Sequence, residues 1–524
     1  MQLLKRYYSL VVIALWGLVC FAFFAFCYPH HLFYQEQNQL FLLSSGYLLT
    51  YLSKPAWMAC LVGDFLTQLY YYLFVGPLVV TLVLLTLGDV LRRALEKAGV
   101  RQPWAFIVAV ACITLEAFSA MQLGSKLSEM IALTGGATLF WLSCYGKRYA
   151  RYLTPVLLIA TFWLFGVGMW VYIALLLVAV CCDRERRLQI ITVALTVVSV
   201  ALLWLARGIY YMDYGTMLTY PTLHQPAKPD FRVERYLAVD DEYRWGHYAK
   251  VVSMVEAMDQ PEEQITFYYN LANAQMGQLP EKLLTLDHTD LGTFRRIGPS
   301  TPISIIKNMN ELYFALGDMT FAERAAMMAN VFSSDNRNVR MMKRLAETSI
   351  VSSDTAVAMK YVRLLQKTLI YRTWADAHDL SKGPIKDAAL LAKRAYTNRK
   401  DTLRVNDNAR MLIMELLDSN PKNTLALDYL LCSDLLLKDM ESFKADYDRY
   451  CMQQDKGRNR PIYQQALMIY LAGTNAPQEQ WERYIRDNQQ LQQFNAYNNA
   501  RGSEAFKGTY WYYFDKGQAP RTDY

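Results

Sequence analysis

Seven apolar segments fill the first 206 residues of this 524-residue chain and mark it as an integral membrane protein. An α-helix rises 1.5 Å per residue, so about 20 apolar residues cross a hydrocarbon core about 30 Å thick. We therefore predict an all-α fold that begins with a bundle of seven transmembrane helices, at about residues 8–28, 70–91, 104–120, 127–144, 152–165, 169–182 and 188–206. Residues 29–69 form the first outer loop.

The apolar stretch 152–182 decides how often the chain crosses the membrane. We divide it at Gly166-Val167-Gly168 into two short helices. A single span here would leave six crossings and would put the basic residues near Lys147 and near Arg184 on opposite faces. Seven crossings keep them on one face, and six crossings stay an alternative.

The positive charges of the membrane part predict its orientation. Of its 14 Lys and Arg residues, 12 lie on alternating loops, and Lys54 and Lys126 are the exceptions. Short loops rich in Lys and Arg remain in the cytoplasm. We expect a cytoplasmic N-terminus and an extracytoplasmic chain beyond Ala206.

Charge also argues against nucleic-acid binding. Of the net charge of +7, the first 206 residues carry +6 and the remainder +1, so the positive excess follows the membrane topology. Seven of the nine cysteines lie in or beside apolar spans. We predict no disulfide between Cys432 and Cys451, because they lie on successive helices about 15 Å apart along the axis.

Helical periodicity dominates the part of the chain outside the membrane. A connector with three prolines, 207–231, leads to a helical domain at 232–497, and an aromatic tail follows at 498–524. Helix pairs are indicated at 309–330 and at 421–451. Thr320 followed by Glu323 matches a capping box, which predicts that the second helix of the first pair begins there.

These units of about 30 to 35 residues resemble tetratricopeptide-like repeats, which are helix pairs that stack into a superhelix. The similarity rests on Asn270-Leu271-Ala272 with Ala274 and Gly277, and on the proline-containing run 419–423. It implies a repeat-like array with an extended binding surface. Paired helices without repeat ancestry are the alternative.

Acidic residues on the outer side are the candidate site. Glu36 and Asp64 lie in the first outer loop, and Glu116 lies in the outer half of the third span. An ionisable group in a span is costly and usually faces a protein interior or a wet cavity. The structural alternative for Glu116 is a hydrogen bond or a pair with Lys126, which can also pair with Glu129.

The N-terminal part also resembles membrane glycosyltransferases that use lipid-linked sugars. Glu36 in the outer loop, Gly63-Asp64-Phe65 and the run from Tyr70-Tyr71 to Gly76-Pro77-Leu78 carry this similarity over about residues 1–80. It implies that Glu36 acts as catalytic base or metal ligand, supported by Asp64 or Glu116. Lys54 and Lys126 would contact a lipid phosphate. This chain departs from the family in two ways. Glu36 is followed by Gln37, where a second acid often stands, and the number of spans is smaller than usual.

As a whole, the chain resembles uncharacterised Bacteroidetes membrane proteins with a helical extracytoplasmic domain, which implies a bacterial inner membrane. The adjacent His30-His31 do not suggest a metal site. Two functions stay open: an interaction or assembly protein of the cell envelope without a cofactor, and a glycosyltransferase-like enzyme. Only the enzyme would need a lipid-linked sugar and a divalent metal.

Overall fold

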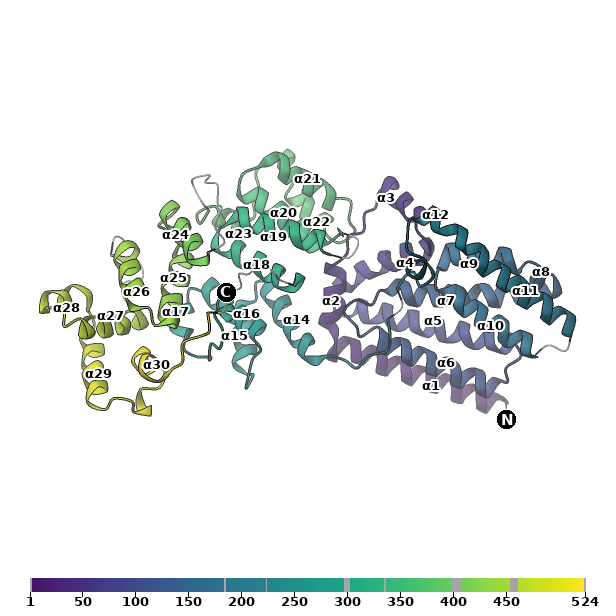
Figure 1. The fold of residues 1–524 in the computed structure, drawn as a ribbon, viewed down its shortest axis with the longest axis horizontal. Helices are drawn as coiled ribbons and strands as arrows, with labels where there is room; N and C mark the ends of the chain where they lie inside the picture. Colours follow the sequence, from purple (N-terminus) through teal and green to yellow (C-terminus); the bar gives the residue numbers. More distant parts are fainter. Residues whose placement is uncertain are drawn as a thin grey trace. The chain divides into compact units, whose positions relative to one another are not determined.

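The structure is a computed structural model that describes residues 2–182, 185–222, 224–295, 302–333, 336–397, 408–452 and 460–522. Over these ranges the secondary structure is helical and contains no β-strand (Figure 1), which confirms the all-α class. The chain divides into two compact units. The first comprises Met1–Glu234, Arg337–Val339 and Leu364–Asp376, and the second comprises Arg235–Asn336, Arg340–Arg363 and Ala377–Tyr524.

The first unit contains the apolar helices. Its helices are α1 Gln2–Ala22, α2 Pro29–Gln37, α3 Ser45–Leu49, α4 Trp57–Thr67, α5 Val75–Lys97, α6 Gln102–Ser119, α7 Leu127–Ser143, α8 Lys147–Tyr152, α9 Thr154–Phe165, α10 Gly168–Cys182, α11 Arg186–Leu202, α12 Arg207–Tyr210 and α13 Tyr214–Leu218. Within the part of the chain that the structure describes, five continuous helical segments are long and apolar enough to cross a membrane: Ser9–Cys27, Val75–Lys97, Gln102–Ser119, Leu127–Gly146 and Arg186–Tyr210.

The remaining apolar stretch is divided, as the sequence indicates. Helices α9 and α10 pack against each other, and α9 ends at Gly166, whose φ of 51° a side chain would disfavour. Helix α5 continues six residues beyond its predicted end. Asp89 and Glu96 explain this extension, because they form i,i+3 and i,i+4 ion pairs with Arg92 and Arg93 that support the last turns.

Helix α7 packs against α4, α5, α9 and α10 through small residues. A Cβ on Gly136 would lie 1.9 Å from the carbonyl oxygen of Gly168, and a Cβ on Gly168 would lie 2.0 Å from that of Ala132. Such contacts bring two backbones together, as in small-xxx-small packing of membrane helices. Helices α7 and α10 can therefore lie this close together only because Gly136 and Gly168 have no side chains.

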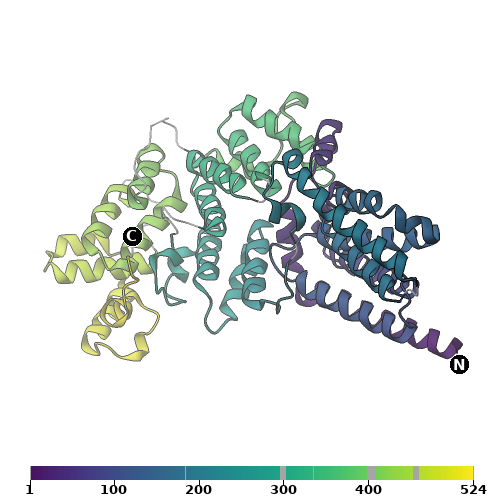
Figure 2. The ribbon, with the colours of Figure 1, turned by 45° about the vertical axis from the view of Figure 1, so that its right-hand side comes forward.

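The second unit is a set of helix–turn–helix elements (Figure 2). Helices α14 and α20–α22 carry residues of both units. The helices from α14 onward are α14 Phe231–Arg244, α15 Tyr248–Glu256, α16 Glu263–Gln275, α17 Leu279–Lys282, α18 Ile303–Leu316, α19 Met319–Val331, α20 Val339–Val351, α21 Thr355–Leu365, α22 Arg372–Ala377, α23 Ala388–Lys393, α24 Ala409–Ser419, α25 Thr424–Leu437, α26 Met440–Asp446, α27 Pro461–Gly473, α28 Gln478–Tyr484, α29 Asn488–Asn499 and α30 Tyr510–Lys516.

One turn recurs between these helices. Six helices end at a residue with positive φ, and the next N–H donates to the carbonyl five residues back, at 2.8–3.0 Å; the six residues are Gly246, Gly277, Gly317, Ser353, Lys438 and Asn475. This is the Schellman arrangement, which satisfies carbonyl groups at a helix end. The first four residues follow one another at intervals of 31, 40 and 36 positions.

The turn after α18 corrects one sequence prediction. Asp318, and not Thr320, caps α19, because its side chain accepts a hydrogen bond from the Phe321 N–H at 3.2 Å. Asp439 caps α26 in the same way through the Ser442 N–H. At both turns, a positive-φ residue ends one helix and the Asp that follows it caps the next helix. The prediction that α19 begins at the Thr320–Glu323 capping box is therefore wrong.

One large apolar core in the second unit joins helices that the sequence suggests are separate pairs. Helix α25 packs against α16, α17 and α18 as well as against its neighbours α24 and α26. The aromatic tail joins this core, because Tyr510 in α30 is fully buried and donates to the carbonyl of Leu435 at 2.9 Å. Contacts therefore extend beyond nearest neighbours.

We predict that Gly136→Ala destabilises the first unit by about 1–3 kcal/mol, the usual cost of overpacking. The added Cβ would meet the Gly168 carbonyl, so α7 and α10 must separate. Thermal unfolding in detergent measures the effect. Gly46→Ala is the matched control, because nothing lies within 4 Å of a Cβ there. Equal melting temperatures of the two variants would contradict the close contact.

Candidate functional site

Glu36 lies on α2 and is buried, with 3% of its surface exposed. Pro29 starts this helix, where the missing N–H costs nothing. The Glu36 carboxylate accepts a hydrogen bond from the Tyr371 hydroxyl at 3.1 Å. Because Tyr371 belongs to Leu364–Asp376, this partner comes from more than 300 residues further along the chain.

A small pocket in the first unit contains the Glu36 carboxylate. It is lined by Glu36, Gln39, Phe41, Gln68, Val339, Thr368, Ile370 and Tyr371. Its free space is sufficient for about one water molecule. Neither Asp64 nor Glu116 lines it. A pocket of this size suits a bound water and is too small for a sugar.

Hydrogen bonds attach Arg337–Val339 and Leu364–Asp376, the two later segments of the first unit, to residues 38–43. The Leu43 N–H donates to the Lys367 carbonyl at 2.7 Å, and the Val339 N–H donates to the Gln39 carbonyl at 3.1 Å. The side chain of Asn338 donates to that of Asn38 at 3.0 Å. Gln39 and Val339 also line the Glu36 pocket, so these contacts lie beside it.

Asp64 lies on α4 next to this pocket. Its carboxylate accepts a hydrogen bond from the Tyr51 hydroxyl at 2.7 Å. Its main-chain carbonyl accepts one from the side chain of Gln39, which also lines the Glu36 pocket, at 2.9 Å. Burial and the Asp64 charge raise the pKa of Tyr51 well above its usual value, so this phenol remains a donor.

Three predicted site residues act on one thiol. The charges of Asp64, Lys126 and Lys54 all act on the thiol of Cys60, which is buried on α4.

Glu116 lies on α6, and its side chain forms no hydrogen bond or ion pair within the described ranges. The nearby acid that acts on it by charge is Glu129. Glu129 accepts a hydrogen bond from the main-chain N–H of His224 at 3.2 Å, a second bond from the His224 ring, and a third from the Lys126 main-chain N–H at 3.3 Å. His224, in the connector, was not predicted as a partner.

His31 and Glu234 form a further polar cluster that sequence reasoning missed. The Glu234 carboxylate accepts the main-chain N–H groups of His30 and His31, at 2.7 and 3.1 Å, and so caps the first turn of α2. Burial lowers the pKa of His31 to about 4, so its ring is neutral. Among the described residues, no group of His, Cys, Asp and Glu is arranged to hold a metal ion.

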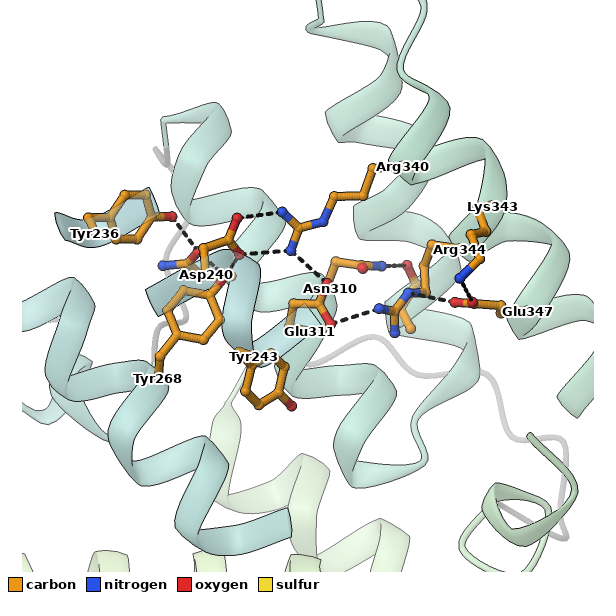
Figure 3. A network of polar contacts seen from close by, with 12 residues as sticks. Tyr236, Asp240, Tyr243, Tyr268, Asn310, Glu311, Arg340, Lys343, Arg344 and Glu347 are labelled. Carbon is orange, nitrogen blue, oxygen red and sulfur yellow. Dashed lines mark hydrogen bonds and ion pairs between the residues drawn. The ribbon is translucent and has the colours of Figure 1, made fainter. Parts of the chain in front are cut away.

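The second unit contains a buried ionic network (Figure 3). Both oxygens of Asp240 accept from the Arg340 guanidinium, at 2.6 and 2.8 Å. Glu311 accepts from Arg340 at 2.9 Å and from Arg344 at 2.7 Å, so it joins the two arginines. The Tyr268 hydroxyl also donates to Asp240. The network links α14, α16, α18 and α20.

Lys307 adds an unfavourable charge beside this network. Its side chain is buried, and the pKa of its ammonium group is lowered to about 7, mainly by burial and then by the positive charge of Arg340. Asp240 partly opposes this shift. A cation held in a buried, already basic environment destabilises the folded state whenever it is protonated.

Comparison with known proteins gives a family without an activity. Residues 5–517 match the model of a family of unknown function, DUF6057. No curated protein and no solved structure matches the chain.

We predict that Tyr371→Phe lowers the free energy of unfolding by about 1.5–3 kcal/mol, the usual value for a hydrogen bond to a charged group. The variant removes the hydroxyl that donates to Glu36. Denaturant unfolding in detergent measures the loss, and Tyr72→Phe is a half-exposed control. In a double-mutant cycle with Glu36→Leu, additive losses would show that the two side chains do not interact.

We also predict that Lys307 makes stability depend on pH. The folded-state pKa is about 7 and the usual value is 10.5, so between these values the unfolded chain binds more protons. Stability should therefore rise with pH from about 7 to about 10.5, by at most about 1.4 kcal/mol per pH unit. Thermal unfolding at pH 7, 8 and 9 measures this slope. Lys307→Met should flatten it and raise stability at pH 7, whereas equal slopes would exclude Lys307 as the cause.

Proposed function

The chain belongs to the family of unknown function DUF6057, and we propose that it is a membrane-anchored interaction or assembly protein of the cell envelope. In this proposal the first unit anchors the protein in a bacterial inner membrane. The helices beyond the connector form an extracytoplasmic domain that binds envelope proteins. No nucleic acid and no cofactor takes part.

Exposed apolar side chains support the membrane placement. Leu82 on α5, Ile107 on α6 and Val197 on α11 are each more than half exposed, although they lie within helices long enough to span a bilayer. Lipid would remove these side chains from water. With α9 and α10 as a hairpin, the total is seven crossings. The Lys and Arg distribution then favours a cytoplasmic N-terminus.

One exposed helix face carries the interaction proposal. Helix α19 and its C-cap expose four large apolar side chains on adjacent positions of one face: Met327, Met328, Val331 and Phe332. Phe332 is 64% exposed and Val331 is 58% exposed. An apolar patch of this kind outside the membrane is typical of protein-binding surfaces, and Met residues adapt well to partners. The recurring Schellman turns support a tetratricopeptide-like arrangement around it.

A glycosyltransferase-like enzyme is the second candidate. Its support is that the charges of Asp64, Lys54 and Lys126 act on the same thiol, Cys60, and two lysines beside an acid would suit a lipid phosphate. Glu36 would then be the base or the ligand of a divalent metal, and Glu116 would support the donor sugar. The size of the Glu36 pocket argues for the interaction protein, because a lipid-linked sugar needs a larger cavity.

Cysteine labelling tests the topology. Tyr149→Cys and Tyr211→Cys place thiols at strongly exposed positions before α9 and after α11. Exposed Cys27, Cys181 and Cys182 are first replaced by Ser. We expect a membrane-impermeant maleimide to label only Tyr211→Cys in cells with a permeabilised outer membrane. Labelling of both positions from one side would indicate six crossings.

Site-specific photo-crosslinking tests the partner surface. A photoreactive residue at Phe332 should give discrete crosslinks to an envelope protein in living cells. The same residue at exposed Lys360 is the control. Val331→Glu should abolish the Phe332 crosslink without changing the melting temperature, because this side chain is more than half exposed. Absence of crosslinks from Phe332 would contradict this surface.

A further inference from the structure

Helix α4 in the outer loop has an unusual exposed face. The three most exposed residues of α4 are all apolar: Met58, Val62 and Phe65 are 40%, 36% and 38% exposed, and they are spaced i, i+4 and i+7 on one face. Its opposite face, with Ala59, Cys60, Gly63 and Thr67, is buried. A helix at a water-facing protein surface exposes polar residues, and one that is apolar on all sides belongs in a core or in a membrane.

Contacts along α4 show that it runs antiparallel to α7. A Cβ on Gly63 would lie 2.6 Å from the Ser128 backbone nitrogen, at the start of α7. At the other end of α4, the Ala56 Cβ would lie 2.7 Å from a Cβ on Gly166. Gly166 is two residues from Gly168, which contacts Gly136 of α7. Between these ends, fully buried Ala59 and Ala132 belong to one apolar cluster.

The depth of the Ala56 end follows from this register. In the proposed topology α7 enters the membrane at Leu127, so Gly136, nine residues further, lies about 13 Å deeper. The Ala56 end of α4 is near that level, and Gly63 is near the start of α7. The apolar cluster also contains Leu87, twelve residues into α5 and about 18 Å from its outer end.

The short hairpin leaves space for such a helix. Helices α9 and α10 have 12 and 15 residues and are about 18 and 22 Å long, which is less than a 30 Å hydrocarbon core. At their junction the Val167 N–H donates to the Tyr220 carbonyl at 2.8 Å, and the Trp170 indole donates to the Leu218 carbonyl at 3.0 Å. Irregular backbone within a membrane requires such protein partners.

We infer that residues 54–67 form a re-entrant segment that enters the outer leaflet and returns as α4, with Met58, Val62 and Phe65 against lipid acyl chains. The inference rests on the proposed membrane placement of the first unit. Continuity supports it, because α4 leads through half-exposed Tyr72 and Phe74 directly into the apolar helix α5. Helix α4 then fills the outer leaflet above the α9–α10 junction.

Spin labelling of the full chain in phospholipid vesicles tests this inference. Met58→Cys, Val62→Cys and Phe65→Cys are made in the background without exposed cysteines and carry a nitroxide. Leu82→Cys on α5 is the lipid-facing reference, and Lys360→Cys is the water-facing reference. Collision rates with oxygen and with a water-soluble nickel chelate measure the environment of each label. Unchanged melting temperatures show that the variants are folded.

The three α4 labels should collide preferentially with oxygen, like Leu82→Cys. The label at Met58 should be the deepest and that at Phe65 the shallowest, because α4 rises about 10 Å between them. Nickel-accessible labels on α4 beside an oxygen-accessible Leu82 label would overturn the re-entrant segment alone. A reversed depth order would also overturn it. A nickel-accessible Leu82 label would overturn the membrane placement itself.

Discussion

Close backbone contact around α7 holds the first unit together, and the positions of the other apolar helices follow from it. Gly136 meets the Gly168 carbonyl, and Gly63 of α4 meets the backbone of Ser128. For helices in a bilayer, as we propose for this unit, van der Waals packing between small residues stabilises association, because helices gain little from leaving lipid for protein. Ala56, directly before α4, and the Tyr220 carbonyl both lie against Gly166, between α9 and α10.

The acidic residues of the first unit are organised by the same requirement. A carboxylate removed from water needs donors. Distant segments of the chain supply Tyr371 for Glu36 and His224 for Glu129, and Tyr51 in the same segment donates to Asp64. Glu234 in turn caps the helix that carries Glu36. These bonds link α2 to Glu234 and to Leu364–Asp376, and they link α7 to the connector. The acids thus hold together parts of the first unit that lie far apart in the sequence.

Much of this architecture could be predicted from sequence, because apolar length and helical periodicity are local signals. The α9–α10 break lay at Gly166, within the predicted Gly166-Val167-Gly168 division, and helix pairs were found at the predicted 309–330 and 421–451. The predicted cap at Thr320 was wrong. Gly317 adopts positive φ and ends α18, and the next residue, Asp318, caps α19. The attachment of residues 337–339 and 364–376 to the outer loop could not be foreseen, since single residues such as Tyr371 give no periodic signal. The topology and the roles of Glu36, Asp64, Glu116, Lys54 and Lys126 stay predictions.

The two units illustrate different ways of burying charge. In the first, Glu36 and Asp64 accept hydrogen bonds from tyrosine hydroxyl groups, and Glu129 accepts them from His224 and from the Lys126 backbone N–H. In the second, Asp240 and Glu311 are paired with Arg340 and Arg344, and burial of these ions is favourable only while the geometry is complete. The positive charge of Arg340 also helps to lower the pKa of the buried Lys307 beside the network. Such a network fixes the relative positions of α14, α18 and α20.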